Sequence, residues 1–285
     1  MAQLKNTTIN DTGFLKLPAG NNQARPPSPS TGNIRVNTEF DVEEIYNGTD
    51  WVKEPTIIKD GLACYLDAGN LSSYNPSVST TAWNDISGNG RNFVWQSNPV
   101  YRRSYSSAWF ETSGRRALGP ASNSFGINNT SGYTIFYVAR TTSFSANGAF
   151  KFYNTLGRTG SSNSRGIFVH PGWQNSIIYF DQGGCCADDQ RLQVGLPAEV
   201  FQAWQVWALR STVATRSIFR NGVREAHTTI TAADVNLGTA GVDLGNVDEA
   251  YDWVATLGSF AVYNRGLTDA EVIEVSNVLL RRFSA

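Results

Sequence analysis

The sequence is poor in charge of either sign. Only 16% of its 285 residues are charged, against roughly 25% in an average soluble protein, and the formal net charge is −1. A near-neutral chain lacks the basic surface on which non-specific nucleic-acid binding depends, and it lacks the polybasic patch of a protein that binds anionic membranes. No apolar run approaches the ~18 residues of a membrane-spanning helix. We therefore expect neither a nucleic-acid partner nor insertion into a membrane.

Cysteine is also scarce, with only Cys64, Cys185 and Cys186. An odd count with one adjacent pair is not a disulfide framework, and adjacent cysteines rarely bridge each other because the geometry is strained. We expect all three to be reduced. The N-terminal letters MAQLKNTTIND contain no apolar stretch of the kind a secretory signal needs, so we expect assembly in a cytoplasm.

Turn-forming residues and short apolar segments are what the sequence has in abundance. Residues 133–140 are apolar, β-branched or aromatic almost throughout, which is typical of a strand buried on both faces. Asn221-Gly222 separates two short strand-like runs and predicts a hairpin. No alternation of strands with helices is visible, so residues 56–285 are predicted to form an all-β sandwich. The expected strands are 61–68, 133–140, 151–156, 166–169, 177–181, 204–210, 216–220 and 254–263.

One helix is expected at the C-terminal end of the chain. Thr268 and Glu271 have the spacing of a capping box, in which each side chain binds the backbone N–H of the other residue. Val272, Val275 and Leu279 follow at helical spacing and give one apolar stripe. The sequence therefore predicts a short helix that packs on the sandwich.

The first 55 residues differ in composition from the rest. Three prolines within residues 26–29 favour an extended path, and residues 33–52 alternate as a hairpin with Asn47-Gly48 at its turn. A hairpin of this size is marginal alone. We therefore expect an extended N-terminal anchoring arm that docks on a partner. The candidate anchoring residues are Arg25, Pro26, Pro29, Ile34, Val36 and Trp51.

Three segments of the remaining chain resemble one family. They are GLACYLDAGN at 61–70, SIFRNG at 217–222 and LGSFAVYNRGLTDAEV at 257–272. Together, and in this order, they resemble the concanavalin A-like, laminin-G-like jelly-roll family, which often ends in a Y-N-R motif followed by a short helix. The resemblance implies a jelly-roll β-sandwich over residues 61–283. We expect no cofactor, with a bound Ca²⁺, which is common in this fold family, as the alternative.

The arm is similar to a different family. LPAG at 17–20, RPPSP at 25–29, GNIRVNT at 32–38 and YNGTDWV at 46–52 resemble a module of tailed-phage structural proteins, including those of cyanobacterial phages. Val36 replaces the usual tyrosine, and the module occurs once. The resemblance implies a protein of the virion surface, with phage capsid or tail proteins and sister subunits as partners. Head decoration and a fibre or appendage both remain open.

The segment Glu39-Phe40-Asp41-Val42-Glu43 matches the E-x-D-x-E signature of laminarinase-type glycoside hydrolases. On one strand, a period of two would place the three carboxylates on the same face, within the distance of a retaining mechanism. The segment precedes the predicted sandwich, however, whereas in those enzymes the signature lies on a central strand. We favour a polar segment of an exposed hairpin and keep hydrolysis as an alternative.

Two loops carry oxygen ligands that could hold a calcium ion. Asp85, Ser87 and Asn89 alternate before Gly90, as in the first half of a calcium loop, but Gln96 stands where that loop has its glutamate. Asp188 and Asp189 form a second acidic pair. We favour an Asx-rich turn for the first group and a solvated acidic loop for the second.

Sugar recognition needs an aromatic platform beside polar side chains. His170 with Trp173, and Asp181 with Arg191, lie in segments bounded by loops, where β-sandwich proteins usually carry their function. These four residues are the candidate carbohydrate site. Neither histidine of the chain has a nucleophile placed near it by the sequence. The sequence therefore predicts a non-enzymatic virion protein whose jelly roll is displayed outward, with a free lectin or host-adhesion protein as the alternative.

Overall fold

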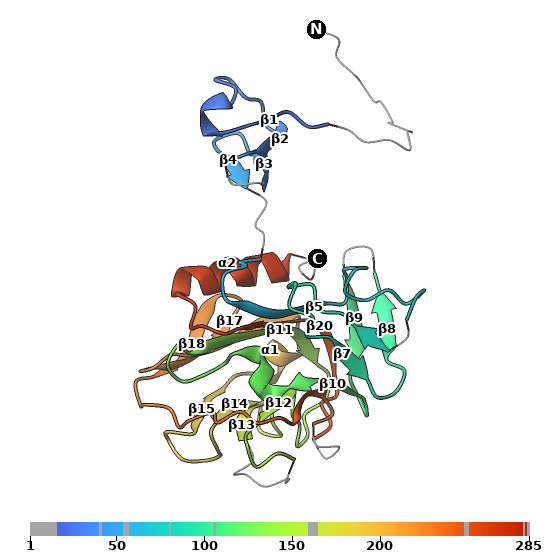
Figure 1. Cartoon of the computed structure of the whole chain (residues 1–285), viewed down its shortest axis with the longest axis vertical. Coiled ribbons are helices and arrows are strands. Elements are labelled where there is room, and N and C mark those ends of the chain that lie inside the picture. The colour runs from blue at the N-terminus through green and yellow to red at the C-terminus, as the bar shows by residue number, and fades with distance from the viewer. Residues whose placement is uncertain are drawn as a thin grey trace. The chain divides into compact units, whose positions relative to one another are not determined.

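The computed structural model describes residues 16–39, 42–53, 57–79, 81–104, 107–158, 165–247, 251–281 and 283. The chain divides into two compact units, residues 1–56 and 57–285 (Figure 1). Within the described part, no helix is both long and apolar enough to cross a membrane.

The first unit is a small sheet in the order β1-β2-β3-β4. Its hairpin turn is built by Asn47, whose side chain accepts the backbone N–H groups of Thr49 and Asp50 at 2.9 and 2.8 Å. The hairpin predicted over residues 33–52 is therefore present. It gains a parallel partner in β1 and a short 3₁₀ turn, η1. The bounds are β1 Ala19–Gly20, η1 Asn22–Ala24, β2 Ile34–Asn37, β3 Val42–Tyr46 and β4 Trp51–Lys53.

Charge rather than apolar packing fills one face of this small sheet. Glu44 is buried and pairs with Arg25 at 2.7 Å and with Arg35 at 3.4 Å. Asn37 donates to the same carboxylate at 2.9 Å. The hydrogen bond from Arg25 is the main cause that lowers the pKa of Glu44. The unit thus has a buried ionic centre, which the sequence analysis did not anticipate.

The second unit is a sandwich of two eight-stranded sheets. We call one the pocket sheet, whose strand order is β15-β14-β13-β12-β19-β10-β7-β6, and the other the helix sheet, ordered β18-β17-β16-β11-β20-β9-β8, with β5 also paired to β20. The pocket sheet has the bounds β6 Ala82–Trp83, β7 Phe93–Trp95, β10 Arg116–Ala121, β12 Phe150–Tyr153, β13 Arg165–His170, β14 Ile177–Gln182, β15 Arg191–Gly195 and β19 Gly241–Gly245. The helix sheet has β5 Leu62–Asp67, β8 Val100–Arg103, β9 Ala108–Glu111, β11 Tyr133–Thr141, β16 Gln205–Ser211, β17 Arg216–Arg220, β18 Val223–Thr228 and β20 Ala255–Tyr263.

Strand β11 shows how the layers are held together. Ile135 and Tyr137 face the core between the two sheets, whereas Phe136 and Val138 face the opposite side, where α2 (Asp269–Leu280) covers the helix sheet. Figure 1 shows this order of layers, with α2 above the helix sheet and β13 to β15 on the far side. The strand is buried on both faces, as its sequence predicts.

The predicted fold class is confirmed: the unit is an all-β sandwich with a short C-terminal helix. All eight predicted strands are present within a few residues, and the capping box of Thr268 and Glu271 begins α2. Several strands were not predicted, namely β1, β6 to β10, β15 and β19, and neither were α1 (Ala198–Gln202) and η2 (Ser122–Phe125). Most of these are short and draw their stability from neighbours in the sheets rather than from their own sequence pattern.

Candidate functional site

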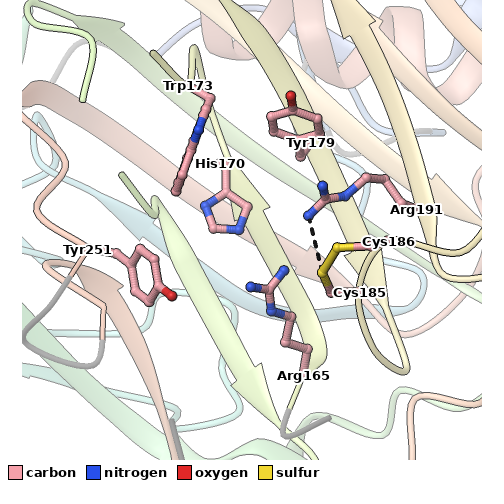
Figure 2. A pocket seen from close by; sticks show the side chains of 8 residues that line it. All are labelled: Arg165, His170, Trp173, Tyr179, Cys185, Cys186, Arg191 and Tyr251. Carbon is pink, nitrogen blue, oxygen red and sulfur yellow. Dashed lines mark hydrogen bonds between the residues drawn. A yellow bond between two sulfur atoms is a disulfide. The ribbon is translucent and has the colours of Figure 1, made fainter. Parts of the chain in front are cut away.

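A cavity of about 260 Å³ opens on the face of the pocket sheet that points away from the core. Side chains alternate across a strand, so Ile167 and Val169 of β13 enter the core while His170 faces outward. Strands supply Arg165, His170, Tyr179 and Arg191, and loops supply Trp173, Tyr251, Cys185 and Cys186. Figure 2 shows both guanidinium groups directed toward the centre of this pocket, with the aromatic side chains and the disulfide around them.

Three half-buried aromatic rings surround the histidine of the pocket. Trp173 stands edge-to-face on His170 with ring centroids 4.8 Å apart, and its centroid lies 6.3 Å from those of both Tyr179 and Tyr251. His170 itself is only 2% exposed. The arrangement leaves apolar ring surface around a small polar opening, which is the form that a pocket for a small polar molecule takes.

The turn between β13 and β14 sets the position of Trp173. Its N–H donates to Ile177 and its carbonyl accepts from Ser176, at 2.8 and 2.7 Å. Gly172 precedes it with φ of 68°, and a Cβ there would lie 2.7 Å from the Phe144 ring. Only glycine fits both the left-handed conformation and the close approach. The P-G-W sequence thus turns the tryptophan back over the sheet.

A fully buried carboxylate organises the two arginines. Asp181 accepts from Arg191 Nε at 2.6 Å and from Arg191 Nη2 at 2.8 Å, and it also accepts from Arg165 Nη1. Asp181 and Arg191 are direct partners in the β14–β15 register. Burial alone would raise the pKa of Asp181, but the hydrogen bonds of Arg191 and the charge of Arg165 outweigh it, so the pKa lies below its usual range. The acid is therefore ionised and holds both guanidinium groups in place.

His170 is held in one tautomer. Its Nδ1 lies within hydrogen-bond distance of the carbonyl oxygen of Asn147, and because a carbonyl only accepts, Nδ1 carries the hydrogen. Nε2 lies 3.7 Å from Asp181 Oδ2. Burial is the main cause that lowers the pKa of His170, aided by the charge of Arg165 and opposed by Asp181. The imidazole is thus neutral at pH 7.

The expectation that all three cysteines are reduced is wrong for two of them. Cys185 and Cys186 are joined in a disulfide in the loop between β14 and β15. Cys186 has φ of 86°, a left-handed backbone conformation that non-glycine residues rarely adopt. The expectation of reduced cysteines assumed an ordinary backbone conformation at both residues. Arg191 Nη2 lies 3.7 Å from Cys185 Sγ. Cys64 remains a buried free thiol.

The structure gathers all four candidate sugar-binding residues at this place. His170, Trp173 and Arg191 line the pocket, and Asp181 lies behind them. Whether they bind a sugar stays a prediction. Sequence reasoning missed Arg165, Tyr179 and Tyr251, as well as the disulfide. Tyr179 carried a signal, since it lies two residues before Asp181 and so shares its face of β14, but nothing near Tyr251 in the sequence links it to β13.

The two calcium candidates lie elsewhere. Asp85 accepts N–H groups from Tyr65, Ser87 and Arg91 at 2.8, 2.9 and 2.9 Å, and Asn89 donates to Leu62 O at 2.9 Å. This is the bonding of an Asx-rich turn. Asp188 and Asp189 are exposed in the loop before β15. Within the described ranges, no group of three or more histidine, cysteine or acidic side chains is placed to hold a metal ion.

The carboxylates of the hydrolase alternative do not share one strand. Glu39 lies in the turn after β2, whereas Glu43 lies on β3, and both are exposed. Asp41 is outside the described residues. The single strand face that the hydrolase alternative requires is not formed, because the chain leaves the strand conformation at Thr38 and Glu39 before it resumes at β3.

Comparison with known proteins identifies the fold but no family. The chain matches no family model, and no curated protein is similar to it in sequence. Solved structures are similar to it in fold. The receptor binding domain of a botulinum neurotoxin C/D mosaic serotype has a TM-score of 0.58 at 14% identity, over 79% of this chain and 52% of that one. The binding domain of Paraclostridial Mosquitocidal Protein 1 has 0.56 at 14%, over 78% and 53%.

A Trypanosoma rangeli sialidase is also similar, with a TM-score of 0.54 at 13% identity, over 78% of this chain and 33% of the sialidase. This chain thus corresponds to about a third of that protein and to about half of each toxin domain. The shared part is the β-sandwich. At these identities the likeness establishes the fold alone.

Proposed function

We propose that this protein is a non-enzymatic carbohydrate-binding protein whose ligand occupies the pocket of His170, Trp173 and Arg191. The observation that carries the proposal is the combination of half-buried aromatic rings with fixed polar groups in one cavity. Sugars present an apolar face of C–H groups and a rim of hydroxyls, so they need both kinds of contact. The pocket is too small for a long chain to enter, and we expect it to take one terminal sugar unit.

Two features support binding over catalysis. Nδ1 of the neutral His170 is bound to the carbonyl of Asn147, and Nε2, which carries the lone pair, lies 3.7 Å from the carboxylate of Asp181 and not beside a nucleophile. Asp181, the carboxylate nearest the pocket, is fully buried and occupied by two arginines. Neither group has the freedom that a general base requires. Two of the structures similar in fold are, by name, binding domains.

The test is a glycan array probed with the full-length protein. We expect binding that Trp173→Ala abolishes. Trp109→Ala is the matched control, because Trp109 is also half-buried and packs on Trp204, but it lies on β9 of the other sheet. An array without signal, or signal that Trp173→Ala leaves unchanged, would overturn the proposal.

The first unit is proposed to attach this domain to a phage particle. The support is the similarity of residues 17–52 to a phage structural module, together with the compactness of residues 1–56 as a separate unit. Deletion of residues 1–55 is expected to abolish incorporation of the protein into particles while the sandwich still binds its glycan. Normal incorporation of the shortened protein would contradict the anchoring role. The copy number per virion would then separate head decoration from a tail appendage.

A further inference from the structure

We infer that the pocket selects sugars that carry a carboxylate, an inference that rests on the proposed glycan-binding function. The first observation is the charge of the site. Arg165 and Arg191 are both cationic, His170 is neutral, and Asp181 is the only acid in contact with them among the described residues. The acidic side chains of the next loop, Asp188 and Asp189, are exposed and do not line the pocket. Within the part of the chain that the structure describes, one positive charge of this group is therefore left without a partner.

The second observation is the set of donors that remains. Asp181 engages Nε and Nη2 of Arg191, and Nη1 of Arg165. Nη1 of Arg191 and Nε and Nη2 of Arg165 have no protein partner within the described part of the chain. None of them is among the buried donors that lack a partner, and both arginines line the cavity. Figure 2 shows the two guanidinium groups converging there.

The third observation is rigidity. The side chains of Arg165 and Arg191 are only 11% and 20% exposed. Arg191 Cζ also lies over the Tyr179 ring, 4.3 Å from its centroid, and Arg165 Cζ lies over the Phe168 ring, 5.0 Å from its centroid. Their planes are fixed before a ligand arrives. Planar forks held in this way match a planar carboxylate.

A neutral sugar would satisfy these donors less well. It would displace water from a site with net positive charge and offer only hydroxyl oxygens in return. A carboxylate neutralises the charge and accepts charge-assisted hydrogen bonds, each of which is about twice as strong as a neutral one. We expect an acidic sugar to bind roughly ten- to a hundred-fold more tightly than its neutral counterpart. The site is thus built for a uronic acid or another sugar acid at the end of a glycan.

The experiment compares glycan classes and then one matched pair. The array is scored separately for carboxylated, sulfated and neutral glycans. The full-length protein is then titrated with glucuronate, with its methyl ester and with glucose, which share one ring and differ at C6. N-acetylneuraminate serves as a carboxylated sugar with a different ring. Preference for the free acids, reduced at high salt, is the expected result.

Arg165→Gln is the decisive variant. It removes one guanidinium but leaves the paired hydrogen bonds of Arg191 with Asp181 in place, so the sheet is expected to fold. It should remove at least most of the preference for the acid, while Arg103→Gln, an exposed arginine of β8, should leave that preference unchanged. Array signal confined to neutral or sulfated glycans, or a preference for acids that Arg165→Gln does not alter, would overturn this inference while leaving glycan binding intact. An array with no signal would overturn both proposals.

Discussion

Arg191 binds both oxygens of Asp181, with 2.6 Å from Nε to Oδ1 and 2.8 Å from Nη2 to Oδ2. The two residues face each other directly across strands β14 and β15. Because Asp181 is fully buried, this pair fixes the edge of the pocket sheet and the position of the guanidinium group at the same time. Stability and the proposed ligand recognition therefore depend on the same contact.

Asp181→Asn is expected to destabilise the sandwich strongly. The substitution leaves Arg165 and Arg191 without their carboxylate, and breaking a buried ion pair typically costs about 3–5 kcal/mol. Both arginines are partly exposed, so we expect the lower end, about 3 kcal/mol, in urea unfolding. Asp188→Asn, an exposed acid of the neighbouring loop, should change the free energy of unfolding little. Equal stabilities of the two variants would show that the pair is not structural.

The pH dependence of stability is expected to reveal the buried His170. An unfolded histidine titrates near pH 6.5, whereas burial lowers the pKa of His170 in the folded protein. The unfolded chain therefore takes up the proton first, and stability falls as the pH drops below about 6.5. Asp181, whose folded pKa is also lowered, loses its contribution only below about pH 4.

The measurement is urea unfolding between pH 7 and 5. The wild-type protein should lose up to about 1.4 kcal/mol per pH unit more than His170→Gln does. His227→Gln, which changes the exposed histidine, should behave like the wild type. The opposite sign, with His170 stabilising the protein more as it becomes charged, would mean that Asp181 prevails over burial.

Pocket residues that lie close together in the sequence could be predicted, whereas those far apart in the sequence could not. His170, Trp173, Asp181 and Arg191 fall within 22 residues of one another in consecutive strands, so their nearness follows from a simple antiparallel meander. Tyr251 reaches the same pocket from a loop after β19, which adjoins β12 only in the folded sheet. No local pattern encodes such a contact, because it depends on the complete order of strands.

The strands too were predictable only where the local sequence carries a clear pattern. Strand β11 was predictable because nine residues of nearly continuous apolar sequence are buried on both faces. Strands β6 and β7 have two and three residues, too few to establish a period. Trp204 and Trp207 lie on opposite sides of the helix sheet, with Trp207 in the core between the two sheets and Trp204 packed against the apolar cluster under α2.

Alkylation should count the cysteines in three steps. Native protein is expected to react with iodoacetamide at no cysteine, because Cys185 and Cys186 are bonded and Cys64 is fully buried, where burial raises the pKa of its thiol well above the usual range. Denatured protein without reductant should gain one alkyl group, on Cys64. Denatured and reduced protein should gain three. Labelling of Cys186 in the native protein, read by mass spectrometry, would contradict the disulfide.

Loss of the helix cap should cost a moderate amount of stability. Thr268 Oγ1 accepts the Glu271 N–H at 3.2 Å, and Glu271 accepts the Thr268 N–H at 2.7 Å. The Arg265 hydrogen bond is the main cause that lowers the pKa of Glu271 to about 2. Thr268→Ala is expected to lower the free energy of unfolding by about 1 kcal/mol. Thr229→Ala, an exposed threonine outside any cap, should have almost no effect in the same urea titration.

The small N-terminal sheet offers a comparison between adjacent residues on one strand. Glu44 is buried and pairs with Arg25 and Arg35, while Glu43 is exposed on the opposite face. Glu44→Gln leaves the nearly buried Arg35 without its carboxylate, at a cost of about 3–5 kcal/mol. A unit of this size has little apolar surface with which to offset that loss. We therefore expect Glu44→Gln to unfold it.

Trypsin reports the result in the full-length protein. Cleavage after Arg35, which is 3% exposed in the folded sheet, should be slow in the wild type and in Glu43→Gln, and rapid in Glu44→Gln. The sandwich should unfold at the wild-type urea concentration in all three proteins, because the two units are separately compact. Resistance of Glu44→Gln to trypsin at Arg35 would show that the ionic centre does not hold the small sheet together, and its stability would then have to come from apolar contacts such as Tyr46 with Trp51.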